Sequence, residues 1–173
     1  LVLMGAAVLA VGWHGHPAAV LAPAAPPVSD QRSFANLPLA FEPNQGQNDP
    51  VVLFQSRMAG YSLYLTADEA VIGVRGAGWP LRLVWQGAGA HPDVAGLDRL
   101  PGKHHYLKGS DPTRWHRNIP TYGKVRYQGL YPGIDLVYYG RDRQLEYDLV
   151  VAPGSDPKQI RLALTGMDRM QID

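Results

Sequence analysis

Residues 134–151 constrain the fold of this chain more than any other segment. Their sequence, IDLVYYGRDRQLEYDLVV, alternates polar and apolar side chains on both sides of a turn signal that begins at Gly140. Successive side chains of a β-strand point to opposite faces of a sheet, so a period of two indicates a strand. We therefore expect an antiparallel β-hairpin with one apolar face. That face carries Leu136, Tyr138, Tyr147 and Leu149.

Shorter segments of the same kind recur after residue 34, and many of the 19 glycines and 15 prolines separate them. The further strands that we expect cover residues 51–57, 60–66, 70–75, 81–86, 122–127 and 160–165. No segment shows three turns of helical periodicity. Many short strands with turn residues between them are typical of sandwiches, so we expect an all-β domain, an antiparallel β-sandwich-like fold with short helical turns.

Two single helical turns are expected at Asp111-Pro112 and at Asp156-Pro157. The aspartate accepts a hydrogen bond from a free backbone N–H, and proline suits the first helical position. A calcium loop is the alternative, but it needs several oxygen ligands at alternating positions within about twelve residues. Neither segment has them, so we expect caps, with Trp115 and Ile160 turned into the core.

The N-terminal residues differ from the rest of the chain. Residues 1–11, LVLMGAAVLAV, have the length of the apolar region of a signal peptide and are shorter than the roughly 20 residues of a membrane-spanning helix. An Ala- and Pro-rich stretch follows. We expect a signal-peptide-like segment and linker over residues 1–33, and a β-rich module over 34–173 that is secreted or on a bacterial cell surface. The alternative for the apolar run is a buried N-terminal helix.

The last residues also alternate, with Met170 and Ile172 on one side of residues 167–173. A strand without a partner at a chain end would leave an open sheet edge. We therefore expect the module to be truncated at its C-terminal end, so that the natural protein continues past Asp173.

Composition and motifs exclude several functional classes. The net charge is +1, and the 16 basic and 15 acidic residues are mixed, so we expect no nucleic-acid partner. There is no cysteine, which rules out disulfides and thiolate chemistry. The adjacent His104 and His105 point to opposite faces of a strand and cannot share a metal ion there. With no phosphate loop and no Gly-x-Ser-x-Gly either, we predict no cofactor, no metal and no catalytic residue.

The polar face of the 134–151 hairpin carries the candidate ligand-binding residues, Asp135, Tyr139, Glu146 and Asp148. A turn at residues 140–143 would place Asp135 directly opposite Asp148, and like charges in that arrangement destabilise a sheet. Water, a metal ion, a shared proton or a basic side chain would have to compensate. Arg126 and Arg161 are the basic residues that we favour for this role.

Three uses of this polar face are open. It can be a structural face with salt bridges, which we favour, or a contact for a cation or other ligand. It can also be catalytic, because two carboxylates about 5 Å apart suit a retaining glycosidase. The ring of Tyr139 could stack on a sugar or a peptide, or it could only support the sheet.

A series of motifs in fixed order resembles the N-terminal domain of bacterial SBBP (β-propeller) repeat-containing proteins. The motifs lie at residues 37–47, 60–65, 96–103, 111–115, 119–122, 131–140, 145–148 and 152–154. The resemblance covers residues 34–173. It implies a secreted module of unknown function that precedes propeller repeats, and it supplies no catalytic residues.

The leading hypothesis is therefore an exported, non-enzymatic structural or interaction module ahead of a β-propeller. Its partners would be its own downstream repeats, a surface glycan or a protein, with no membrane contact beyond the export signal. The alternatives are a carbohydrate- or cation-binding module and a glycan-active hydrolase that uses Asp135, Glu146 and Asp148.

Overall fold

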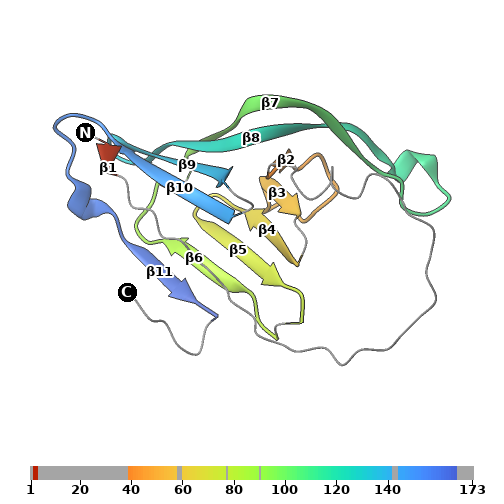
Figure 1. The fold of residues 1–173 in the computed structure, drawn as a ribbon, viewed down its shortest axis with the longest axis horizontal. Coiled ribbons are helices and arrows are strands. Elements are labelled where there is room, and N and C mark those ends of the chain that lie inside the picture. The colour runs from red at the N-terminus through yellow and green to blue at the C-terminus, as the bar shows by residue number, and fades with distance from the viewer. Residues whose placement is uncertain are drawn as a thin grey trace, which may run out of the picture.

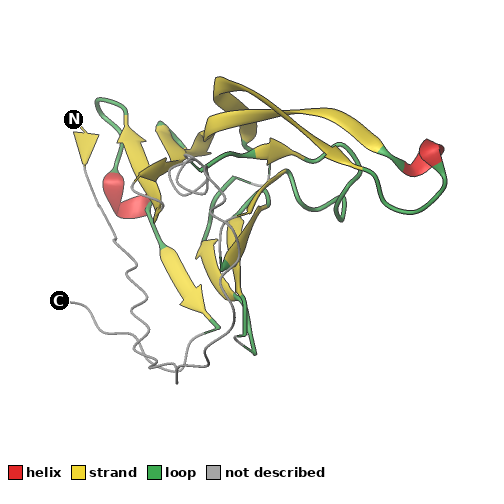
Figure 2. Cartoon of the chain, turned by 45° about the vertical axis from the view of Figure 1, so that its right-hand side comes forward, coloured by secondary structure: helices red, strands yellow, loops and turns green. Residues whose placement is uncertain are grey.

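The chain folds into two antiparallel β-sheets, as the sequence predicts, and their layers face each other (Figures 1 and 2). In this computed structural model the described residues are 2–3, 39–57, 60–76, 78–89, 91–141 and 144–166. Most of the predicted signal-peptide-like segment and linker, residues 1–33, lies outside the described residues. The predicted C-terminal strand, residues 167–173 with Met170 and Ile172, lies outside them as well. Among the described residues, no helix is both long and apolar enough to span a lipid bilayer.

The first sheet contains five strands in the order β1-β10-β9-β8-β7. Their bounds are β1 Val2–Leu3, β7 Asp93–Tyr106, β8 His116–Tyr131, β9 Ile134–Arg141 and β10 Gln144–Val151. The strands β9 and β10 are the predicted hairpin. Val2 and Leu3 of the apolar N-terminal run pair with Val150 and Leu149 at the edge of this sheet.

The second sheet contains six strands in the order β11-β6-β5-β4-β3-β2. Their bounds are β2 Glu42–Pro43, β3 Phe54–Arg57, β4 Tyr61–Leu65, β5 Glu69–Val74, β6 Leu81–Trp85 and β11 Leu162–Thr165. Apart from β2, these are the short strands that the alternation predicts. After β10 of the first sheet the chain returns to the second sheet, where β11 pairs with β6.

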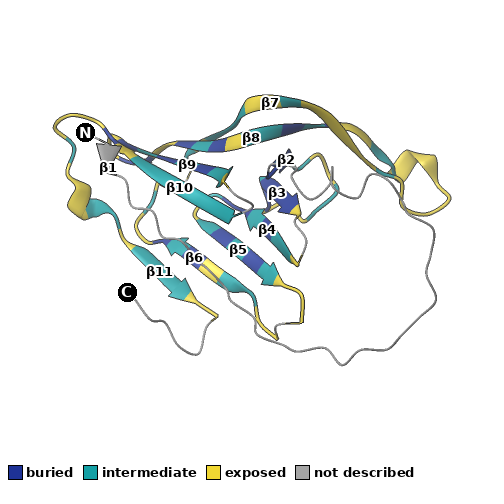
Figure 3. Ribbon diagram, viewed as in Figure 1, coloured by how far each residue is buried: buried dark blue, intermediate teal, exposed yellow. Residues whose placement is uncertain are grey.

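The core lies between the sheets, and buried positions occur on strands of both (Figure 3). Aromatic side chains from both sheets contribute to it. Trp85 of β6 donates an indole hydrogen bond of 2.8 Å to the hydroxyl of Tyr138 on β9. Tyr127 of β8 donates from its hydroxyl to the carbonyl of Thr66, at 2.7 Å. These buried polar contacts satisfy groups that would otherwise be costly to remove from water, and they fix the position of one sheet on the other.

The hairpin of β7 and β8 is much longer than the other strands and projects beyond the sheets as a two-stranded arm (Figure 1). We define the arm as residues 99–118. The sequence analysis missed β7, and residues 101–105 within it are all exposed. Its pairing with β8 is interrupted by two register shifts, between Leu100 and Lys103 and between His104 and Tyr106.

The predicted register of the β9–β10 hairpin is wrong by two residues. Arg141 pairs with Gln144, so the strands continue through Gly140, and Asp148 lies opposite Val137 instead of Asp135. Gly140 has a different role from the one that we predicted, since a Cβ there would overlap Leu39. Because the shift is even, the faces are unchanged. Leu136 and Tyr138 are buried, and Tyr147 and Leu149 pack against the core.

Both predicted helical turns are present as 3₁₀ turns, η1 Pro112–Arg114 and η2 Pro157–Gln159. Asp111 and Asp156 cap them through hydrogen bonds of 2.9 Å from the backbone N–H groups of Thr113 and Lys158. Ile160 packs against the core as expected. Trp115 does not. It donates to the carbonyl of Gly109 and packs against Arg117 in the arm.

Candidate functional site

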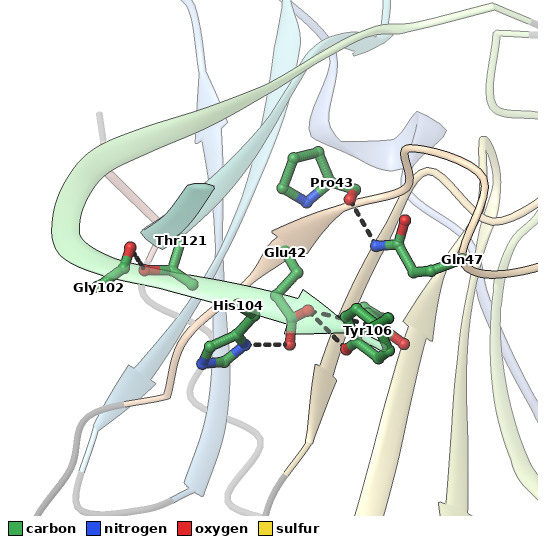
Figure 4. A network of polar contacts seen from close by, with 8 residues as sticks. Glu42, Pro43, Gln47, Gly102, His104, Tyr106 and Thr121 are labelled. Atoms are coloured by element: carbon green, nitrogen blue, oxygen red, sulfur yellow. Dashed lines mark hydrogen bonds and ion pairs between the residues drawn. The ribbon is translucent and has the colours of Figure 1, made fainter. Parts of the chain in front are cut away.

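The candidate site is built where the chain crosses from one sheet to the other. Phe41 forms a two-way backbone bridge with Tyr122 of β8, with hydrogen bonds of 2.8 and 2.9 Å. The next residue, Glu42, pairs instead with Gln55 of β3 in the second sheet. The crossing therefore turns the side chain of Glu42 towards the base of the arm, where β7 passes over β2 (Figure 4).

Glu42 is a buried carboxylate, 2% exposed, that three polar side chains from the two sheets surround. The hydroxyl of Tyr106 donates to its Oε2 at 2.6 Å, and Gln55 donates to the same oxygen at 3.2 Å. The Nδ1 of His104 lies 2.8 Å from Oε1. Burying a carboxylate costs free energy unless hydrogen bonds compensate, and here these three donors provide the compensation.

The charge of Glu42 is reflected in the titration of Tyr106. Burial, followed by the hydrogen bond to Glu42 and its negative charge, raises the pKa of Tyr106 to about 12. Arg57 lies 5.1 Å from the centre of the Tyr106 ring and acts in the opposite direction. The hydroxyl therefore stays protonated and remains a donor to Glu42, while it accepts a 2.5 Å hydrogen bond from Gln55.

A pocket of about 500 Å³ opens beside this buried network, at the base of the arm loop. Its lining residues are Gly46, Gln47, Tyr106, Lys108, Gly109, Arg114 and His116. We call it the arm pocket. Tyr106 belongs to both the buried network and the arm pocket, because its hydroxyl donates to Glu42 and it also lines the pocket. The network thus fixes one wall of the pocket from behind.

The wall formed by the loop after β2 is held by its own side chains. The amide nitrogen of Asn44 donates to the carbonyls of Asp49 and Val52 at 2.8 and 2.9 Å, and its oxygen accepts from the backbone N–H of Gly46. Gln47 donates to the carbonyl of Pro43 at 2.8 Å (Figure 4). Side-chain hydrogen bonds to nearby backbone are a common way to fix such turns.

The opposite wall is the arm loop, residues 107–115. It connects β7 to β8, and Tyr106 pairs with His116 where the loop begins and ends. The Asp111 cap and the Trp115–Gly109 hydrogen bond, 3.1 Å long, hold this loop together. Arg117 lies 4.8 Å from the centre of the Trp115 ring. Lys108 and Arg114 extend from this internally braced loop, and both are exposed.

The arm pocket is positively charged. The arm contains five Lys or Arg residues and one Asp, although the chain as a whole has a net charge of only +1. Among the described residues, neither Lys108 nor Arg114 forms an ion pair. The carboxylate of Asp111 in the same loop accepts from the N–H and the hydroxyl of Thr113, at 2.9 and 2.7 Å, and these hydrogen bonds lower its pKa. Lys108 and Arg114 therefore present charged nitrogen donors that no ion pair within the described part of the chain engages.

The four residues predicted as ligand-binding lie elsewhere, on the outer face of β9 and β10. Asp135 accepts a 2.7 Å hydrogen bond from the backbone N–H of Gly129, at the bulge of β8. Asp148 accepts from the hydroxyl of Tyr139 at 3.1 Å, and Glu146 pairs with Tyr139 across the strands. Burial and these two carboxylates raise the pKa of Tyr139 to about 12.

The predicted pairing of these carboxylates with Arg126 or Arg161 is wrong. Arg126 donates to Gln128 at 3.1 Å, and no Lys or Arg ion pair with Asp135 or Asp148 occurs within the described part of the chain. The separation of Asp135 from Asp148 in the true register makes such compensation unnecessary. Among the described residues, no group of three or more His, Asp and Glu side chains is placed to hold a metal ion.

Sequence reasoning missed the residues of the arm pocket because they come from segments about 60 positions apart. One signal was present. Glu42 stands between Phe41 and Pro43 in an otherwise apolar run, and a lone carboxylate in that setting indicates a buried polar contact. The clustering of Lys103, Lys108, Arg114 and Arg117 on one hairpin was hidden because β7 was not recognised as a strand.

A protein-family model described as a domain of unknown function (DUF7948) matches residues 41–173, which include β2 and the arm. Searches of curated proteins and of solved structures find nothing that matches the chain.

Proposed function

The chain belongs to the DUF7948 family, and we propose that it is a non-enzymatic interaction module that binds its partner in the arm pocket. The observation that carries this proposal is the gathering of Lys108, Arg114 and His116 around a space of about 500 Å³. Ligand pockets in proteins have volumes of roughly 300–1,000 Å³ and carry a few convergent polar groups.

The bracing of the pocket walls supports a binding role. The loop after β2 is held through Asn44, the arm loop through Asp111 and Trp115, and Tyr106 through Glu42. A site that is ordered before its ligand arrives loses less conformational entropy on binding. The projection of the arm away from both sheets also leaves room for a large partner (Figure 2).

The chemistry of the pocket supports a non-enzymatic role. Among the described residues, its lining contains no carboxylate and no serine or threonine hydroxyl, and the hydroxyl of Tyr106 is engaged with Glu42. The hydrolase alternative uses Asp135, Glu146 and Asp148 and takes the two aspartates as directly opposed, whereas Asp148 lies opposite Val137. Carbohydrate binding at Tyr139 stays the second candidate, because its ring is held beside Asp148 by a 3.1 Å hydrogen bond.

We further propose that the module is exported and precedes propeller repeats. The apolar residues 1–11 and the motifs shared with the leading domain of SBBP repeat proteins support this. Fusion of residues 1–33 to a reporter enzyme that is active only outside the cytoplasm would test export. Reporter activity that matches a fusion without the segment would contradict it.

A glycan array and a peptide array, probed with three forms of the chain, test the binding function. The forms are the wild type, the Lys108→Gln/Arg114→Gln variant, and an Arg75→Gln/Lys158→Gln control. All four substituted residues are exposed, and both double variants remove two positive charges. We expect partners that bind the wild type and the control but not the pocket variant.

Two results would contradict the proposal. The first is the absence of any ligand whose binding the pocket variant loses. The second is hydrolysis of an arrayed glycan by the wild type, which would instead support the enzyme alternative. Replacing Asp148 with Asn would then show whether the outer face of β10 is responsible.

A further inference from the structure

We propose that the ligand of the arm pocket is an acidic oligosaccharide, with a sugar carboxylate held by Lys108 and Arg114. This inference rests on the proposed function and names the class of its ligand. The net charge of the whole chain, only +1, does not indicate that the arm pocket is positively charged.

The charge of the pocket calls for an anion. Lys108 and Arg114 have no ion-pair partner among the described residues, and His116 adds a third nitrogen donor to the lining. The nearest buried carboxylate, Glu42, is engaged by Tyr106, Gln55 and His104. A guanidinium can bind a carboxylate through two parallel hydrogen bonds, and an ammonium adds a point charge, so the pair suits a carboxylate.

Two glycines line the walls of the pocket. A Cβ at Gly46 would lie 2.9 Å from the Cε1 atom of His116, so a side chain at position 46 would push into the imidazole. Gly109 has a positive φ of 74° and lies on the other wall. Glycine at position 46 therefore leaves the imidazole of His116 in its place in the lining.

The lining favours a sugar over a peptide. The described residues of the lining include no Leu, Ile, Val, Met or Phe, so they offer no apolar pocket for a peptide side chain. The lining provides an aromatic residue, Tyr106, whose hydroxyl is fixed by Glu42 and Gln55. A uronic acid presents a carboxylate for Lys108 and Arg114 and hydroxyl groups for the polar residues of the lining. Its apolar C–H face suits the aromatic residue Tyr106.

Calorimetric titration of the full chain with four probes tests the inference. Trigalacturonate is the acidic sugar, galactotriose its neutral counterpart, triglutamate an acidic peptide of the same length, and inorganic phosphate a bare anion. Each probe is titrated into the wild type, the Lys108→Gln/Arg114→Gln variant and the Arg75→Gln/Lys158→Gln control. Melting curves check that all three forms are folded.

We expect trigalacturonate to bind more tightly than the other probes. Its affinity should fall about tenfold or more in the pocket variant, because two charge-assisted contacts are lost, and should be unchanged in the control. Binding should also weaken as salt increases, since the screening length shortens from about 30 Å at 0.01 M to about 10 Å at 0.1 M.

The other outcomes separate this inference from the proposed function. Triglutamate or phosphate binding as tightly as trigalacturonate would overturn the sugar assignment, as would equal binding of galactotriose. Failure of trigalacturonate to bind would also overturn it. In each case the proposed function stands if the arrays yield any ligand that depends on Lys108 and Arg114, and it fails separately if they do not.

Discussion

At the scale of single residues, the site depends on how Glu42 is compensated. The carboxylate is buried without a Lys or Arg partner among the described residues, and its negative charge is met by Tyr106, Gln55 and His104. The sequence indicates that such a residue is unusual, because it stands between Phe41 and Pro43. It does not indicate the donors, since His104 and Tyr106 lie more than 60 positions away.

Replacing Tyr106 with Phe should lower the free energy of unfolding by about 1–2 kcal/mol, because it removes a 2.6 Å hydrogen bond to a buried carboxylate. Tyr139→Phe is the matched control. It also removes a hydroxyl that donates to a carboxylate, but the Tyr139–Asp148 contact lies on an outer face and should cost less than about 1 kcal/mol. Urea denaturation measures both values, and equal losses would contradict the role of Glu42.

The raised pKa of Tyr106 also predicts a dependence of stability on alkaline pH. A tyrosine with a pKa of about 10 in the unfolded chain and about 12 in the fold contributes stability that is complete below about pH 10. That contribution is lost as the pH rises from about 10 through 12. The wild type should therefore lose stability over this range more steeply than Tyr106→Phe. Parallel curves of unfolding free energy against pH would contradict the expectation.

At the scale of strands, side-chain alternation predicts the two faces of the β9–β10 hairpin but not its register. The even shift of two residues leaves the faces unchanged, so the pattern alone cannot detect it. Gly140 suggested a turn, but its role is to leave space for Leu39, which a Cβ at position 140 would overlap. The strand β7 escaped prediction because it contains Gly96, Pro101 and Gly102 and shows no sustained alternation. Its pairing with β8 determines its conformation.

The register predicts different roles for the two aspartates of the hairpin. Asp135→Ala should cost about 1 kcal/mol, because it removes the 2.7 Å acceptor of the Gly129 N–H at the β8 bulge. Asp148→Asn should change stability by less than about 0.5 kcal/mol, since the amide oxygen can still accept from Tyr139 at this outer face. Thermal denaturation of both variants checks this, and stabilisation by either one would instead indicate directly opposed charges.

At the scale of the whole molecule, buried hydrogen bonds from aromatic side chains connect the two sheets. The alternation predicts which tyrosines face inwards, but it cannot predict that the hydroxyl of Tyr138 meets the indole of Trp85 from the other sheet. The arm pocket has the same origin. Its walls come from residues 46–47 and 106–116, which the crossing at Phe41 and the contacts of Glu42 with β7 bring together.

Tyr138→Phe should lower the free energy of unfolding by about 1–3 kcal/mol, because it leaves the buried indole N–H of Trp85 without an acceptor. In the Trp85→Phe background the same change should cost less, since no donor is left unpaired. A double-mutant cycle followed by chemical denaturation measures this coupling. Additive losses would mean that the hydrogen bond does not connect the sheets.

We propose that the ligand enters the arm pocket and not the outer face of β9 and β10. Mapping backbone amide chemical shifts during a titration with trigalacturonate tests it most directly. We predict that the shifts gather at residues 46–47 and 106–116, and that Lys108→Gln/Arg114→Gln abolishes them. Shifts gathered instead around Tyr139, Glu146 and Asp148 and retained in that variant would contradict the claim.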